Sequence, residues 1–292
     1  MILETFLKET NLPKQHDFPL PIGHLTDFDS LINIFTETMV SPPKKCPNFN
    51  QKITYCSYGQ ISYIKNIECM PGIHNVPVGL IFSSNLTQII HSYYPLDTGA
   101  FFSGMIPEEW RTRLGDINDF RVSGNGDCNS EDSHSKLERN LIFNFYGSHS
   151  NYVSGHILEH HIAEHERLKL LQDFLVEVSN IKGIDMRGRT IECHITDEFK
   201  LLDYLEAVFI PIEHKIDYHR LIAKQMSTIS RLPEVIYYSR HDLMDPGEMC
   251  TNIRNQAGLY ISEKYVDIFS QISQHLIKQP SLMSRFLRRL RS

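Results

Sequence analysis

Apolar and polar positions follow two different patterns along this chain of 292 residues. Short apolar or alternating runs, separated by turn residues, predict strands at 52–58, 76–84, 89–96, 188–196 and 233–240. A short turn or helix followed by another strand is expected at 200–211, where Pro211 ends the run. Apolar residues at helical spacing predict helices at 151–180, 214–230 and 264–278. Because strands and helices do not alternate regularly, we expect an α+β fold.

The segment "LPIGHLTDFDSLINIF" (20–35) combines a short apolar stretch with helical spacing. His24 and Thr26 lie where the first pattern changes into the second. A turn residue would be sufficient there if the segment were only a connector. The junction therefore makes His24 and Thr26 candidate functional residues, although a strand-end histidine can also simply bond to backbone.

A polar segment at 121–139, rich in Gly, Ser, Asn and Asp, predicts an exposed loop. We expect one domain at 1–240 that carries this loop, followed by a helical C-terminal extension at 241–292. The arginine-rich end at 284–292 is typical of a solvated helix end, and a nucleic-acid contact is the alternative.

Composition excludes some classes of protein. The net charge of −6 gives the chain as a whole no electrostatic attraction for nucleic acid. Six cysteines lie scattered without a C-x-x-C pair, which favours a reducing compartment over a thiolate zinc site. The first residues lack the pattern of a signal peptide, and the sequence has no apolar run of about 20 residues, so we expect a cytoplasmic protein without membrane contact.

Four histidines give a second chemical hypothesis. His156 and His160, and likewise His161 and His165, are four residues apart, a spacing compatible with metal binding on one helix face. The stretch is not H-E-x-x-H, and its many charged neighbours are also typical of a solvated helix surface. We expect no metal here, and a metal-dependent enzyme stays the alternative. Phosphate-binding glycine loops and the G-x-S-x-G nucleophile motif are absent from the sequence.

The strand "TIECHIT" (190–196) carries a carboxylate at its centre. Strand alternation places Ile191, Cys193 and Ile195 on one face and Glu192 with His194 on the other. A buried carboxylate without a partner is costly, whereas one that faces a cleft can stabilise positive charge. A solvent-facing strand residue is the alternative interpretation.

The order of these elements resembles a known family. His24-x-Thr26, a helix, an aromatic strand with Tyr55 and Tyr58, and a late glutamate strand together resemble the ADP-ribosyltransferase fold, and most of all the DarT-type toxins that modify nucleic acid. The resemblance implies a split antiparallel sheet flanked by helices. It implies Glu192 as the catalytic glutamate, with Glu206 as the fallback.

Two further segments are similar to a bacterial group related to these toxins. "YCSYGQISYI" (55–64) and "YYPLDTGAF" (93–101) resemble "FYGRPAYR" and "YPFDSGAF". The arginine of the first motif is Gln60 here, so Arg111 or Arg113 would have to bind the cofactor pyrophosphate in its place. Asp97 in the second segment either caps a turn or lines the cleft.

The resemblance implies transfer of ADP-ribose from NAD with loss of nicotinamide. Glu192 would orient the ribose 2′-hydroxyl and stabilise the oxocarbenium-like charge, and His24 with Thr26 would hold the adenosine-side ribose. Tyr58 or Tyr63 would stack on nicotinamide.

The resemblance also implies an acceptor and partners. The acceptor would be nucleic acid: DNA for a DarT-like relative, or messenger RNA for a toxin of the CmdTAC phage-defence type. A toxin of this kind would be held silent by an antitoxin protein, with a chaperone as further partner. The alternative from another class is a catalytically degenerate binding module in which Gln60 marks lost activity.

Overall fold

The computed structural model describes residues 2–9, 19–43, 45–62, 76–125, 137–158, 165–180, 186–225, 232–239 and 246–267. Several of the sequence predictions fall wholly or partly outside these residues. They are the nicotinamide contact of Tyr63, the centre of the expected loop (126–136), the histidines His160 and His161 of the metal hypothesis, most of the helix expected at 264–278, and the basic end at 284–292.

The strands are β1 (Ile22–Asp27), β2 (Met39–Val40), β3 (Lys45–Cys46), β4 (Gln51–Lys52), β5 (Thr54–Tyr58), β6 (Pro77–Phe82), β7 (Ser92–Tyr94), β8 (Val122–Ser123), β9 (Glu192–Ile195), β10 (Phe199–Lys200), β11 (Leu205–Pro211) and β12 (Glu234–Tyr238). The α-helices are α1 (Ile2–Glu9), α2 (Phe28–Glu37), α3 (Thr98–Phe102), α4 (Glu108–Leu114), α5 (Leu137–Tyr146), α6 (His149–Ser154), α7 (Glu166–Asn180), α8 (Leu201–Tyr204), α9 (Lys215–Gln225) and α10 (Pro246–Ile261). Short 3₁₀ turns lie at Ser84–Ile89, Ile117–Phe120, Met186–Arg189 and Ile212–His214, and a π-helical turn at Ser262–Asp267.

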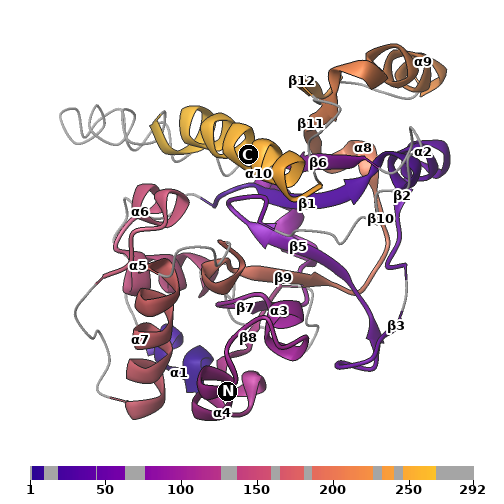
Figure 1. The fold of residues 1–292 in the computed structure, drawn as a ribbon. Coiled ribbons are helices and arrows are strands. Elements are labelled where there is room, and N and C mark those ends of the chain that lie inside the picture. The colour runs from indigo at the N-terminus through magenta and orange to yellow at the C-terminus, as the bar shows by residue number, and fades with distance from the viewer. Residues whose placement is uncertain are drawn as a thin grey trace, which may run out of the picture.

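Eight strands of the described chain form one sheet in the order β12-β11-β6-β1-β5-β9-β7-β8. Neighbouring strands are antiparallel except β11 and β12, which are parallel. The sheet and its flanking helices (Figure 1) confirm the expected α+β class with a mostly antiparallel sheet.

The sheet is split in the middle. β1 and β5 pair only at Ile22 with Tyr58 and at Gly23 with Ser57, whereas β1 pairs with β6 along its whole length. Beyond Gly23 the two strands separate, so their facing backbone groups need other partners. The split divides the sheet into one half that ends at β1 and another that begins at β5.

Each half has its own helical cover. α10 lies over β6 and β1 (Figure 1), and its Met249, Ile253 and Ala257 pack in a core cluster with Leu25 and Phe209 of the sheet. On the opposite face of this half, α2 packs against β1 and β6, and α9 packs against α2. The helices α1, α4, α5 and α7 lie beside the second half (Figure 1). Within the described residues, none of the helices has both the length and the apolar character required to cross a bilayer.

Local chemistry explains where α2 begins and ends. The Asp27 side chain accepts a hydrogen bond from Ser30 N at 2.7 Å and so caps the first turn. Phe28, Leu31 and Phe35 form the buried face, as the spacing predicts. Thr38, with φ of 57°, ends the helix in the left-handed region.

One predicted helix is wrong in its extent. The single helix expected at 151–180 is two helices, α6 and α7, because Gly155 adopts φ of 77° and ends α6. The predicted division of domains at residue 240 stays a prediction. In the fold, α10 packs directly on the sheet.

Candidate functional site

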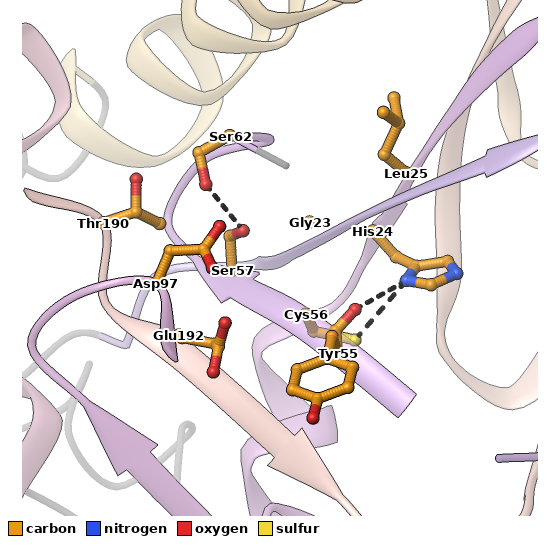
Figure 2. A pocket seen from close by; sticks show the side chains of 10 residues that line it. All are labelled: Gly23, His24, Leu25, Tyr55, Cys56, Ser57, Ser62, Asp97, Thr190 and Glu192. Carbon is orange, nitrogen blue, oxygen red and sulfur yellow. Dashed lines mark hydrogen bonds between the residues drawn. The ribbon is translucent and has the colours of Figure 1, made fainter. Parts of the chain in front are cut away.

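A pocket lies at the split between the two halves of the sheet (Figure 2). Its space is about 280 Å³ when the part open to solvent is included. The lining residues are Gly23, His24 and Leu25 from β1, Tyr55, Cys56 and Ser57 from β5, and Ser62, Asp97, Thr190 and Glu192.

His24 occupies the point where β1 leaves β5. Its Nδ1 hydrogen-bonds the carbonyl of Tyr55 at 2.8 Å, so the imidazole replaces a missing backbone partner of the split sheet. The side chain is half-buried and also lines the pocket. His24 therefore has the backbone-bonded role that the sequence left open and an accessible position at the pocket as well.

Glu192 is the first residue of β9, directly opposite Ser57 of β5, and is 4% exposed. Its Oε1 accepts a hydrogen bond from the Thr98 hydroxyl at 2.5 Å, and its Oε2 accepts one from Thr98 N at 3.2 Å. Glu192 and His194 share one face of the strand, as expected from alternation, with 2.6 Å between Oε1 and His194 Nε2. The first turn of α3 thus holds the carboxyl group in place.

Burial controls the charge of the Glu192 carboxyl group. It raises the pKa of Glu192 to about 8, while hydrogen bonds from Thr98 act in the opposite direction. Burial also lowers the pKa of His194 to about 3, with Arg121 acting in the same direction. Because His194 is neutral, its contact with Glu192 is a hydrogen bond between the two side chains and not an ion pair.

Asp97 is a second carboxyl group in the pocket and is 4% exposed. It caps α3 by accepting a hydrogen bond from Ala100 N at 2.7 Å, and it lines the same pocket as Glu192. The structure thus gives Asp97 both roles that the sequence left open, as cap and as lining residue.

Gln60 is buried and belongs to the frame of the pocket. Its amide nitrogen donates to the hydroxyl groups of Tyr152, at 3.2 Å, and Thr190, at 3.0 Å. The Tyr152 hydroxyl donates to the carbonyl of Tyr58 and accepts from Ile191 N, so it joins β5 to the segment before Glu192. Gln60 is thus bound within the protein and does not point into the pocket.

The structure brings His24 and Glu192 to one pocket but does not place Thr26, Tyr58 or Glu206 in it. Thr26 is buried and is not among the lining residues. Tyr58 is completely buried, its hydroxyl accepts from Leu20 N, and its ring packs in the core. Glu206, the fallback, lies on β11 and accepts a hydrogen bond from Tyr265, away from the pocket.

The two arginines proposed for the pyrophosphate do not line the pocket either. Arg111 donates to the carbonyl of Ile106, and Arg113 stacks on the ring of Trp110 at 4.2 Å. Among the described residues no cluster of three or more His, Cys, Asp or Glu side chains is arranged to hold a metal ion.

Several residues that line the pocket or hold Glu192 were not predicted as functional. Thr98 lies in the quoted segment 93–101 beside Asp97, and the signal available was the Asp-Thr-Gly sequence typical of a helix start. Ser57, Ser62 and Thr190 carry no such signal, because ordinary strand and loop positions look alike in sequence.

Comparisons with known proteins give a likeness of fold. No protein-family model and no curated protein matches the chain. Two solved structures of DarT from Thermus sp. 2.9 are similar to it, each with a TM-score of 0.40 over 78% of this chain. The complex with NAD⁺ is 13% identical and covered over 100% of its length, and the complex with ADP-ribosylated ssDNA is 11% identical and covered over 97%. Both are of the DarT type that the sequence motifs resemble, and a likeness at this level assigns no activity to the chain.

Proposed function

We propose that this protein transfers ADP-ribose from NAD to a nucleic-acid acceptor and releases nicotinamide. The observation that carries the proposal is the meeting of His24 from β1 and Glu192 from β9 in one pocket at the split of the sheet. These two residues are 168 positions apart in the sequence, and the motif resemblance points to both.

The charge of the pocket fits this substrate. Among the described residues, its lining includes the carboxyl groups of Asp97 and Glu192 and no lysine or arginine. Such a lining favours a positively charged group and disfavours phosphate. NAD carries a positive charge on its nicotinamide ring, so we expect the nicotinamide ribose to enter the pocket and the pyrophosphate to stay outside it.

The chemistry follows from the buried carboxyl group. In the reaction the bond between ribose C1′ and the nicotinamide nitrogen breaks, and its electron pair leaves with nicotinamide. Glu192, as the carboxylate, stabilises the positive charge that develops on the ribose. An acceptor nitrogen or oxygen then bonds to C1′ and loses its proton to a base. The cationic ring of the substrate favours the ionised form of Glu192, which is otherwise disfavoured by burial.

Neighbouring side chains position the Glu192 carboxyl group. Thr98 and the first turn of α3 fix the carboxyl by hydrogen bonds, and His194 fixes it from the neighbouring strand position. His24 offers an imidazole nitrogen at the rim, suited to a ribose hydroxyl. A role as a toxin, with an antitoxin and a chaperone as partners, is part of the proposal through the sequence resemblance alone.

The test is incubation of the protein with NAD labelled on its adenylate part and with single-stranded DNA or RNA. Transfer of label and release of nicotinamide are measured for the wild type, for Glu192→Gln and for the control Glu206→Gln. We expect both activities in the wild type and the control, with loss of at least about a hundredfold in Glu192→Gln, because one electrostatic group typically contributes that much. Full transfer by Glu192→Gln would contradict the proposed role of Glu192. Binding of NAD without release of nicotinamide in the wild type would instead support the degenerate binding module.

A further inference from the structure

Four aromatic side chains beside the pocket form what we call the aromatic patch: Phe49, Tyr55, Tyr94 and Phe102. The rings of Phe49, Tyr55 and Tyr94 surround His194, with centroid distances of 4.9, 5.0 and 4.9 Å. Phe102, at the end of α3, contacts Phe49 at 5.7 Å. Since His194 hydrogen-bonds Glu192, the aromatic patch begins one side chain away from the proposed catalytic carboxyl group.

The outer part of the aromatic patch is open to solvent. Phe102 is 39% exposed and the nearby Met105 is 49% exposed, whereas the neighbouring Phe101 is 7% exposed. Phe49 and Tyr55 are half-buried. Exposing a large ring at the end of a helix that also holds Glu192 costs hydrophobic free energy, and such exposed apolar surface is typical of an interaction site.

Positive charges lie on both sides of the aromatic patch. The β3–β4 hairpin, whose turn carries Phe49, places Lys45 directly opposite Lys52, and both are exposed. Like charges at this position destabilise a hairpin, and within the described chain the structure records no ion pair for either lysine. On the other side, the Arg111 guanidinium is held by the carbonyl of Ile106 and lies beside Gly104. The chain as a whole is negative, so these cations are a local feature.

We propose that the aromatic patch, with Lys45, Lys52 and Arg111, binds a single-stranded nucleic acid. A base stacks on the exposed ring of Phe102, which Phe49 contacts edge to face, and the phosphates lie against the three cations. Its role as the acceptor site rests on the proposed function. The combination of exposed rings with flanking positive charges is the arrangement that proteins use for single strands, because each base has a flat face and each nucleotide a negative charge. A duplex hides those faces, so the single strand is the form that fits.

The experiment measures binding of a fluorescent single-stranded oligonucleotide by anisotropy, with DNA and RNA of the same sequence, and without NAD. The variants are Phe102→Ala, Phe102→Trp and the double variant Lys45→Glu/Lys52→Glu. Leu259→Ala is the matched control, because Leu259 is a 66% exposed apolar residue on α10. We expect Phe102→Ala to weaken binding about tenfold, Phe102→Trp to restore it and Leu259→Ala to leave it unchanged. The double variant should weaken binding further and reduce its dependence on salt.

Equal binding by Phe102→Ala and Leu259→Ala, absence of oligonucleotide binding by the wild type, or equally tight binding of duplex would overturn this proposal. Transfer of ADP-ribose to a protein acceptor with no loss in Phe102→Ala would overturn it too, while leaving the transferase reaction intact. Conversely, the expected binding pattern in a protein that releases no nicotinamide from NAD would support the nucleic-acid site and contradict the transferase function.

Discussion

Replacing Glu192 by glutamine tests whether the buried carboxyl group is neutral in the folded protein. Glutamine keeps the shape of the side chain but cannot ionise. In the wild type, burial raises the pKa of Glu192 from its ordinary value of 4.5 to about 8. Between these two values the folded protein therefore binds a proton that the unfolded chain has lost, and the stability of the wild type falls as the pH rises.

The size of this effect on stability follows from the interval between the ordinary pKa of Glu192 and its raised value. Each pH unit between 4.5 and 8 lowers the free energy of unfolding of the wild type by up to about 1.4 kcal/mol relative to the variant. Over the whole interval, this contribution reaches an upper limit of about 5 kcal/mol. The contribution of His194, whose pKa burial lowers to about 3, has the opposite sign below pH 6.5. Since His194 contacts Glu192, the comparison between pH 7 and 8, above the range in which His194 contributes, is the decisive one.

The assay is urea unfolding at pH 5, 6, 7 and 8, followed by the fluorescence of Trp110, the single tryptophan of the chain, which is 4% exposed. The difference in the free energy of unfolding between Glu192→Gln and the wild type should shift steadily in favour of the variant as the pH rises. Glu206→Gln, a glutamate outside the pocket, controls for the exchange of a carboxyl for an amide. A difference that stays constant from pH 5 to 8 would refute the assignment of a neutral Glu192.

Three further results follow from the structure. The wild-type kcat/KM for release of nicotinamide should rise with pH to a midpoint of about 8, because this quantity reports the pKa of Glu192 in the free enzyme. Gly23→Ala should lower the free energy of unfolding by about 1–3 kcal/mol, since its Cβ would lie 2.0 Å from the carbonyl oxygen of Gln60. Tyr152→Phe should lower it by about 1–3 kcal/mol, measured by urea unfolding, because the buried donor Ile191 N would lose its partner.

Each of these results has a control or an outcome that would contradict it. Gly258→Ala is the match for Gly23→Ala, because nothing lies within 4 Å of its added Cβ and it belongs to α10, so this change should stabilise by about 0.5–1 kcal/mol. If both glycine changes alter the free energy of unfolding in the same direction, the close approach of Gln60 to Gly23 is not what makes alanine unfavourable at position 23. A kcat/KM that is flat between pH 6 and 9, or a Tyr152→Phe protein as stable as the wild type, would contradict the corresponding argument.

The sequence was informative where a local pattern decides the structure. The β-rich runs at 76–84 and 188–196 became β6 and β9, and alternation placed Glu192 and His194 on one face. The pairing of His24 with Glu192 in one pocket could be predicted only through the motif resemblance, because no spacing rule links residues so far apart in the chain.

Local sequence patterns could not predict other features of the structure. Tyr58 and Thr26 look like accessible polar strand residues, yet their positions in the sheet turn both into the interior. α6 ends because Gly155 adopts the left-handed conformation. A glycine within an apolar helical pattern does not by itself predict that a helix ends there. The anchoring of Glu192 by Thr98 requires two distant segments to meet, which only the tertiary fold specifies.

The narrow junction between β1 and β5 has a consequence for how the molecule responds to an occupant. β1 and β5 pair at two positions there, and the other connections are the His24 imidazole and the hydrogen bonds of Leu20 N with the Tyr58 hydroxyl and of Gly59 N with the carbonyl of Pro21. Local opening at this seam therefore breaks few interactions. A small molecule that touches Gly23 on one side and Tyr55 on the other adds its binding free energy to the cost of that opening. Occupancy would then slow amide hydrogen exchange along both strands together, far beyond the residues in contact.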